Sequence, residues 1–258
     1  MGYNCGMAAT DRTREWARRL AMRVDPADLE RLTRSMLASI DHVSDSRWEA
    51  AVARAAALPV GVRPEKVKAL SDSFARELGA FGAGVGAAAA TPLVGTTATL
   101  LAASAELAWF TARAGDLVLT VAAVHGRPTP SVEERRAWLL AVLIYGGSAR
   151  DGLARAINEA TTGRSPAQSA RLSLSTLQTV NRILVPQLVR RYGARRGAVA
   201  LGTALPLGIG AIVGGSANYM AVRALARNAD QFFARLPYSA IDTSAIDITG
   251  ALSAPTQR

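Results

Sequence analysis

The residues best suited to chemistry are three charged side chains in an otherwise apolar stretch. Glu106, Arg113 and Asp116 lie between residues 93 and 124, which we predict to form one long helix. Arg113 and Asp116 are three residues apart and so are neighbours on a helix, while Glu106 lies two turns from Arg113 on a similar face. Charges in apolar surroundings must be paired. Two interpretations stay open: an internal ion-pair cluster that fixes helix register, or a polar pocket for a ligand.

A second polar pair, Asn218 and Tyr219, lies in an uncharged stretch near the C-terminus. A buried amide usually satisfies a neighbouring backbone group, so a structural role is the simpler interpretation. The alternative is that Asn218 and Tyr219 join Glu106, Arg113 and Asp116 in a pocket between glycine-rich helices. Such a protein would be a hydrolase or a binder of a small ligand or lipid.

Familiar catalytic motifs are absent from the sequence. The glycines at 208, 210 and 214 superficially match a dinucleotide-binding loop, but no strand precedes them as that mechanism requires. His42 and His125 are the only histidines, and no spacing of histidine and cysteine fits a metal site. We therefore expect no metal and no cofactor, and a protein that is not an enzyme.

Two uncharged runs, residues 78–105 and 197–222, must hold these polar groups in place. Small residues spaced four apart on a helix form a smooth stripe where another backbone can approach closely. The glycines that we expect to pack the two runs together are Gly82 and Gly86 in the first, and Gly210 and Gly214 in the second. No period-2 strand pattern is seen. We predict an all-α fold, a compact multi-helix bundle with a central pair of Gly/Ala-rich apolar helices.

Local signals predict where the helices begin and end. Ser46 with Glu49, and Ser131 with Glu134, have the spacing of capping boxes at helix starts. Helix ends are predicted at three glycine positions and a break at one proline: Gly126, Gly146, Gly193 and Pro92. We divide the chain into N-terminal amphipathic helices (1–63), a helical domain (64–236) and a flexible tail (237–258).

The positive charge is concentrated beside the second uncharged run. The chain carries a formal charge of +10, and residues 160–229 hold nine arginines and no acid. A field of one sign attracts anionic lipids or an acidic partner. Few aromatic residues are interleaved, which argues against a nucleic-acid surface. The residues predicted to form a membrane or anion surface are Arg182, Arg190, Arg191, Arg195 and Arg196.

The uncharged runs are long enough to cross a bilayer, since about 20 apolar residues suffice. Their glycines, threonines and prolines insert poorly, which argues against autonomous spans. We therefore expect a protein that is peripheral to the inner membrane on its cytoplasmic side. The alternative is an integral membrane protein with one helical hairpin.

The C-terminal half resembles the EcsC family. The residues that carry the likeness are 124–143, 184–193 and 205–233, where a proline, a glycine-rich turn and the pair Asn218–Tyr219 precede a final amphipathic helix. In the family's acid-bearing helix the final aromatic-glycine pair has tyrosine, whereas this chain has His125 before Gly126. The family is named for a protein encoded beside the subunits of an ABC transporter, and no reaction is established for it.

The resemblance implies a bacterial helical protein on the cytoplasmic side of the membrane. With the arginine-rich segment, it leads us to expect a non-enzymatic accessory or regulatory factor. Its partner would be an anionic membrane surface or a membrane transport complex such as an ABC transporter. Neither the motifs nor the resemblance indicates an oligomeric state.

Overall fold

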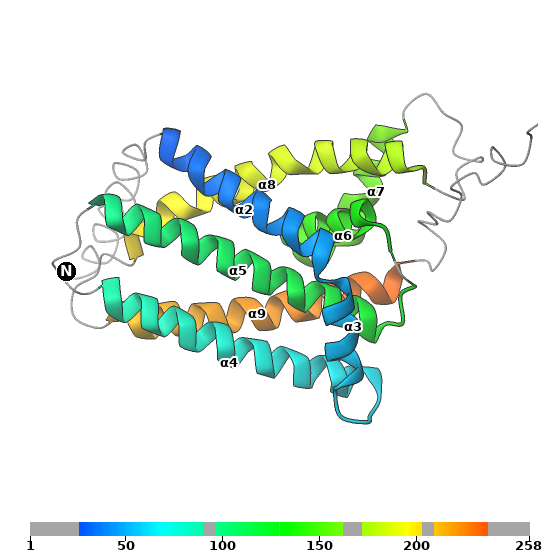
Figure 1. The fold of residues 1–258 in the computed structure, drawn as a ribbon, viewed down its shortest axis with the longest axis horizontal. Coiled ribbons are helices and arrows are strands. Elements are labelled where there is room, and N and C mark those ends of the chain that lie inside the picture. Colours follow the sequence, from blue (N-terminus) through cyan, green and yellow to red (C-terminus); the bar gives the residue numbers. More distant parts are fainter. Residues whose placement is uncertain (1–25, 90–95, 129, 162–171, 203–208, 237–258) are drawn as a thin grey trace, which may run out of the picture.

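The computed structural model describes residues 26–89, 96–128, 130–161, 172–202 and 209–236. For some residues inside helices the description covers the backbone alone: 26–29, 32, 82–89, 96–104, 106, 191–202 and 209–218. Within these ranges the fold is an all-α bundle without strands, as predicted (Figure 1). The helices are α2 (Pro26–Ser46), α3 (Trp48–Ala56), α4 (Arg63–Ala89), α5 (Thr96–Val124), α6 (Val132–Tyr145), η1 (Gly146–Ser148), α7 (Ala149–Ala160), α8 (Leu174–Gly202) and α9 (Ile209–Arg235).

Several predicted helix boundaries are confirmed. The hydroxyl of Ser131 accepts a hydrogen bond from the backbone N–H of Glu134, which caps the start of α6. Gly126 follows the end of α5 with a φ of 67°, and the next N–H, that of Arg127, bonds back to the carbonyl of Ala122. This is a Schellman ending, which favours glycine because its φ is positive. Gly146 ends α6 in the same region of φ, at 57°.

Two predicted boundaries are wrong. Ser46 does not cap α3: it is the last residue of α2, and its hydroxyl donates to the carbonyl of His42 at 2.8 Å. Arg47 stands before α3 instead, without a side-chain cap. Gly193 does not end a helix, because α8 continues through it to Gly202. A glycine inside a helix costs only about 1 kcal/mol relative to alanine, which the rest of the helix offsets.

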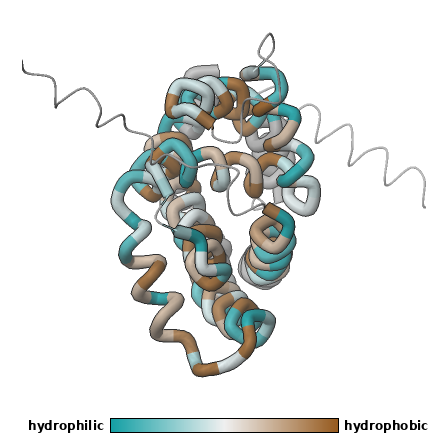
Figure 2. The backbone as a smooth tube through the Cα atoms, turned by 90° about the vertical axis from the view of Figure 1, so that its right-hand side faces the viewer, coloured by the Kyte–Doolittle hydropathy of each residue, from teal (hydrophilic) through white to brown (hydrophobic). Residues whose placement is uncertain are grey.

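Helix α5 lies in the middle of the bundle and contacts α2, α3, α4, α6 and α9. Its C-terminal half and α6 form the deepest part of the core, with Leu117, Leu119, Leu139 and Leu140 fully buried. Buried residues of α2 and α3 belong to the same core. The predicted division at residue 63 therefore falls within one packed unit. Figure 2 views the bundle from the right-hand side of Figure 1 and shows that the helices carry both hydrophilic and hydrophobic residues.

Helices α4 and α9 form the most extensive helix pair among the described elements. They run antiparallel, and an ion pair of 3.2 Å between Asp72 and Arg223 fixes their register. Counting from that ion pair places the glycine-rich end of α4 beside the glycine-rich start of α9. The helices that carry Gly82, Gly86, Gly210 and Gly214 thus lie side by side. The glycines' own contacts lie outside the described residues, so their packing role stays a prediction.

Neither uncharged run forms a single helix. The first is shared between the end of α4 and the start of α5, and the second between the end of α8 and the start of α9. The predicted break at Pro92 falls in residues 90–95, outside the description, and α4 and α5 are separate helices on either side. Figure 1 shows all four uncharged helix ends at the same end of the bundle, on the left.

Candidate functional site

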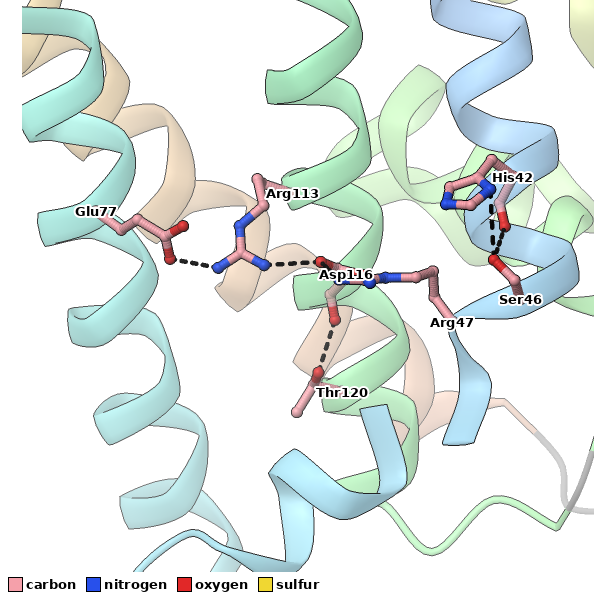
Figure 3. A network of polar contacts seen from close by, with 7 residues as sticks. All are labelled: His42, Ser46, Arg47, Glu77, Arg113, Asp116 and Thr120. Atoms are coloured by element: carbon pink, nitrogen blue, oxygen red, sulfur yellow. Dashed lines mark hydrogen bonds and ion pairs between the residues drawn. The ribbon is translucent and has the colours of Figure 1, made fainter. Parts of the chain in front are cut away.

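A network of ion pairs joins three parts of the bundle around Asp116 (Figure 3). Arg47, between α2 and α3, donates from Nε to Oδ1 of Asp116 at 3.0 Å and from a terminal nitrogen to Oδ2 at 2.9 Å. Arg113, on α5, donates to Oδ2 at 2.8 Å and also bonds to Glu77 of α4. The Asp116 side chain is only 3% exposed. One buried carboxylate therefore binds two guanidinium groups from different elements.

The positive and negative charges within the network balance one another. Hydrogen bonding to Asp116, followed by its negative charge, raises the pKa of Arg47. Burial is the largest influence on Arg113 and lowers its pKa, but Glu77 and Asp116 together outweigh burial, so the pKa is raised. Two cations thus face two carboxylates, and both Asp116 oxygens are occupied. This geometry favours the ion-pair cluster over a ligand pocket.

The same guanidinium of Arg113 also packs on an aromatic ring. It lies 4.9 Å from the centre of the Phe74 ring, and Arg54 of α3 lies 5.3 Å from the same centre. Phe74 is itself buried in the core. Cation–π contacts of this kind stabilise a desolvated arginine. The cluster therefore ties α3, α4 and α5 together.

Of the other predicted pocket residues, only Tyr219 has a described side chain, and it lies in a separate contact. Tyr219 is half-buried on α9, where its hydroxyl lies 3.4 Å from a nitrogen of Arg223 and its ring 5.6 Å from the guanidinium carbon. Glu106 lies in α5 and Asn218 in α9, but their side chains are outside the description. Their proposed role as ligand-binding residues stays a prediction.

A second polar pair was not predicted from the sequence. Nε2 of His125, at the end of α5, lies 2.8 Å from a carboxylate oxygen of Asp230 on α9. The neighbouring Arg127 donates to the carbonyls of Phe233 and Leu236 at 2.5 and 2.6 Å. Phe233 lies in the last turn of α9 and Leu236 directly follows the helix, where backbone acceptors lack partners within the helix. The motif that ends α5 thus also caps and anchors the end of α9.

The arginine-rich segment lies on α8. Arg182 and Arg190 are exposed, whereas only the backbone is described for Arg191, Arg195 and Arg196, all within the same helix. The first half of α8 packs on α6 and α7 through Leu177, Val180, Leu184 and Leu188. Its second half carries the cluster of arginines and leads to the uncharged helix ends. Along α8, the arginine-rich stretch is therefore followed directly by an uncharged helix end.

The uncharged helix ends form one feature, which we name the uncharged end. It comprises residues 78–89 of α4, 96–105 of α5, 197–202 of α8 and 209–222 of α9, none of which is charged. Phe81, which belongs to it, stacks on Trp109 of α5 with the ring centres 3.9 Å apart. This aromatic pair lies between most of the uncharged end and the ion-pair network.

Among the described residues, one helical window is long and apolar enough to cross a membrane, Leu107–Val124 of α5. That window is 61% buried inside the bundle and contains Arg113 and Asp116. Core helices of soluble proteins have the same properties. Also within the described residues, no three histidine, cysteine or acidic side chains are grouped as metal ligands.

No protein-family model, curated protein or solved structure matches the chain.

Proposed function

We propose that this chain is a non-enzymatic helical protein of the cytoplasmic membrane face, and an accessory or regulatory factor of a membrane transport complex. One observation carries the proposal: the acid-free, arginine-rich half of α8 leads directly into the uncharged end of the bundle. A basic surface beside an uncharged one matches an anionic bilayer, where headgroups attract arginine and the interior excludes charge.

The transport partner follows from the sequence rather than from the geometry. Residues 205–233, which span the start of α9 and most of its length, resemble the EcsC family. That family is named for a protein encoded beside an ABC transporter. A factor that acts on such a complex must reach the membrane. The arginine-rich half of α8 would bring it there by attraction to anionic headgroups.

Vesicle flotation tests membrane association. We expect the protein to float with vesicles of phosphatidylglycerol and phosphatidylcholine, but weakly with phosphatidylcholine alone. Raising the salt from about 0.05 M to about 0.5 M should release it, because screening shortens the reach of exposed charges. Binding that is indifferent to both lipid charge and salt would contradict the proposal.

Matched arginine variants locate the binding surface. Replacing Arg190, Arg191, Arg195 and Arg196 by glutamine should weaken partition to anionic vesicles about a hundredfold or more, because each arginine near the surface contributes about 1 kcal/mol. The control removes the same charge from exposed arginines on other helices: Arg34, Arg150, Arg227 and Arg235. Equal losses in both variants would show a general charge effect and remove α8 from the proposal.

A further inference from the structure

The contacts beside the uncharged end occur in a fixed order along α4. Moving from the uncharged end toward the other end of the bundle, one meets the Phe81–Trp109 stack first. The ion pair between Glu77 and Arg113 follows one turn further, and the Asp72–Arg223 pair comes after it. The order is therefore uncharged, aromatic and then charged. A bilayer has the same order from its hydrocarbon to water, and tryptophan is enriched at the boundary.

We infer that the uncharged end enters the hydrocarbon of one membrane leaflet, with the Phe81–Trp109 stack at headgroup level. The inference rests on the proposed membrane function and specifies how the bundle meets the lipid. Phe81 and Trp109 are both half-buried, so part of each ring is open to the surroundings. Aromatic rings with such partial exposure suit the amphipathic boundary between headgroups and acyl chains.

The lengths of the uncharged helix ends fit one leaflet. At about 1.5 Å per residue, α4 extends about 12 Å beyond Phe81. Arg223 pairs with Asp72, about 14 Å behind Phe81, so the start of α9 extends about 8 Å past the aromatic pair. The uncharged start of α5 adds about 15 Å. Half of the hydrocarbon thickness is about 15 Å, so these ends are too short to cross the bilayer but long enough to enter it. Glu106 lies three residues from Trp109 on α5, which places it at headgroup level.

The ion-pair network limits how deep the bundle can go. Arg47, Glu77, Arg113 and Asp116 lie behind the aromatic pair and would be costly in hydrocarbon. The helical window that could span a membrane contains two residues of this network, Arg113 and Asp116, and is mostly buried inside the bundle. Entry therefore stops near the aromatic pair, as in a protein inserted in one leaflet.

Single labelled cysteines measure the depth. Cys5 is the only cysteine, so a Cys5→Ser background accepts one new site. Ala105→Cys lies one turn beyond Trp109 on the uncharged side, and Ala69→Cys lies further back on α4; both alanines are exposed. On vesicles of phosphatidylglycerol and phosphatidylcholine, an environment-sensitive dye at 105 should shift to the blue. Spin-labelled acyl chains should quench it, while the dye at 69 stays in water.

Each outcome decides between explanations. If the protein floats with vesicles but the dye at 105 stays in water, the insertion is wrong while membrane association stands. If it does not float, both proposals fail. If the dye at 105 shifts to the blue without vesicles as the protein concentration rises, its surroundings have become apolar because a second copy covers this end. The insertion is then wrong.

A charge placed at the uncharged end gives an independent test. Ala98→Asp, eight residues and about 12 Å deeper than Glu106 along α5, should weaken partition to these vesicles about tenfold or more, since a charged side chain is costly below the headgroups. Ala69→Asp is the matched control, because it adds the same charge to an exposed alanine behind the ion-pair network. Thermal unfolding of both variants without lipid should be equal. Equal partition of the two variants would overturn the inference.

Discussion

His125 at the end of α5 and Asp230 on α9 are joined by a 2.8 Å contact between Nε2 and a carboxylate oxygen. The histidine side chain is 3% exposed and that of the aspartate 35%. The contact lies at the opposite end of α5 from the uncharged end. It holds α9 where Arg127 caps its last carbonyls. This end of the bundle is therefore fixed by polar contacts.

The His125–Asp230 contact predicts a pH-dependent stability. Burial is the main cause that lowers the pKa of His125, with the charges of Arg63 and Arg127 adding to it and Asp230 opposing it. The unfolded chain then takes up a proton first, near pH 6.5. The free energy of unfolding should therefore fall as the pH drops from about 6.5 toward the lower pKa of the folded state. Urea unfolding between about pH 5 and pH 8 measures this slope.

Substitutions assign the slope to His125. His125→Gln keeps an N–H near Asp230 but cannot titrate, so this part of the pH slope should vanish. Asp230→Asn removes the influence that raises the histidine pKa, so the loss of stability should extend to lower pH. His42→Gln, at an exposed histidine, is the control and should keep the slope. An unchanged slope in His125→Gln would rule out the assignment.

Asp116→Asn should be strongly destabilising, by about 3–5 kcal/mol, because it leaves the charges of Arg47 and Arg113 without their shared buried partner. Glu77→Gln should cost less, about 1 kcal/mol, since its side chain is 41% exposed and water can replace part of the contact. Chemical denaturation measures both values. Equal costs would mean that Asp116 does not act as the centre of the network.

Arg135→Met should destabilise the protein by about 2–4 kcal/mol. Arg135 is buried and donates to the carbonyls of Ser44, Pro130 and Asp45 at 2.5, 3.0 and 3.3 Å. Two of these carbonyls end α2, so the arginine caps that helix from α6. Burial is the main cause that lowers the pKa of Arg135, and the negative charges of Asp45 and Glu134 oppose it.

The adjacent Arg136 supplies the control for Arg135. It forms a 2.9 Å ion pair with Asp41, but the two side chains are 28% and 50% exposed. Exposed pairs contribute about 0–1 kcal/mol, so Arg136→Met should change stability little. If both variants lose the same stability, the loss comes from arginine packing in general and the capping role of Arg135 is wrong.

Helix boundaries could be predicted where the signal is local. Ser131 caps α6 and Gly126 ends α5, because a hydroxyl or a positive φ acts over a few residues. Ser46 has the same local signal, but Arg47 is held by Asp116, 69 residues away, and α2 runs on through Ser46. Gly193 shows that a single glycine is too weak to end a helix that packing supports.

Only part of the candidate site could be predicted from the sequence. The Arg113–Asp116 pair follows from a spacing of three residues on one helix. Arg47 and Glu77 come from other elements, and no periodicity along α5 indicates them. The His125–Asp230 contact likewise joins residues 105 positions apart. Such partners depend on how helices pack, which pattern alone does not specify.

Gly152→Ala should destabilise the protein by about 1–3 kcal/mol through overpacking. A Cβ on Gly152 of α7 would lie 2.1 Å from the Tyr145 ring, which cannot move freely because its hydroxyl bonds to Gln187. Gly147→Ala is the control, since its nearest neighbour would be 3.7 Å away, and it should be neutral or slightly stabilising. In a Tyr145→Ala background the Gly152→Ala cost should largely disappear, because the clashing ring is gone. A cost that persists there would show that α7 needs glycine for its backbone rather than for space beneath the ring.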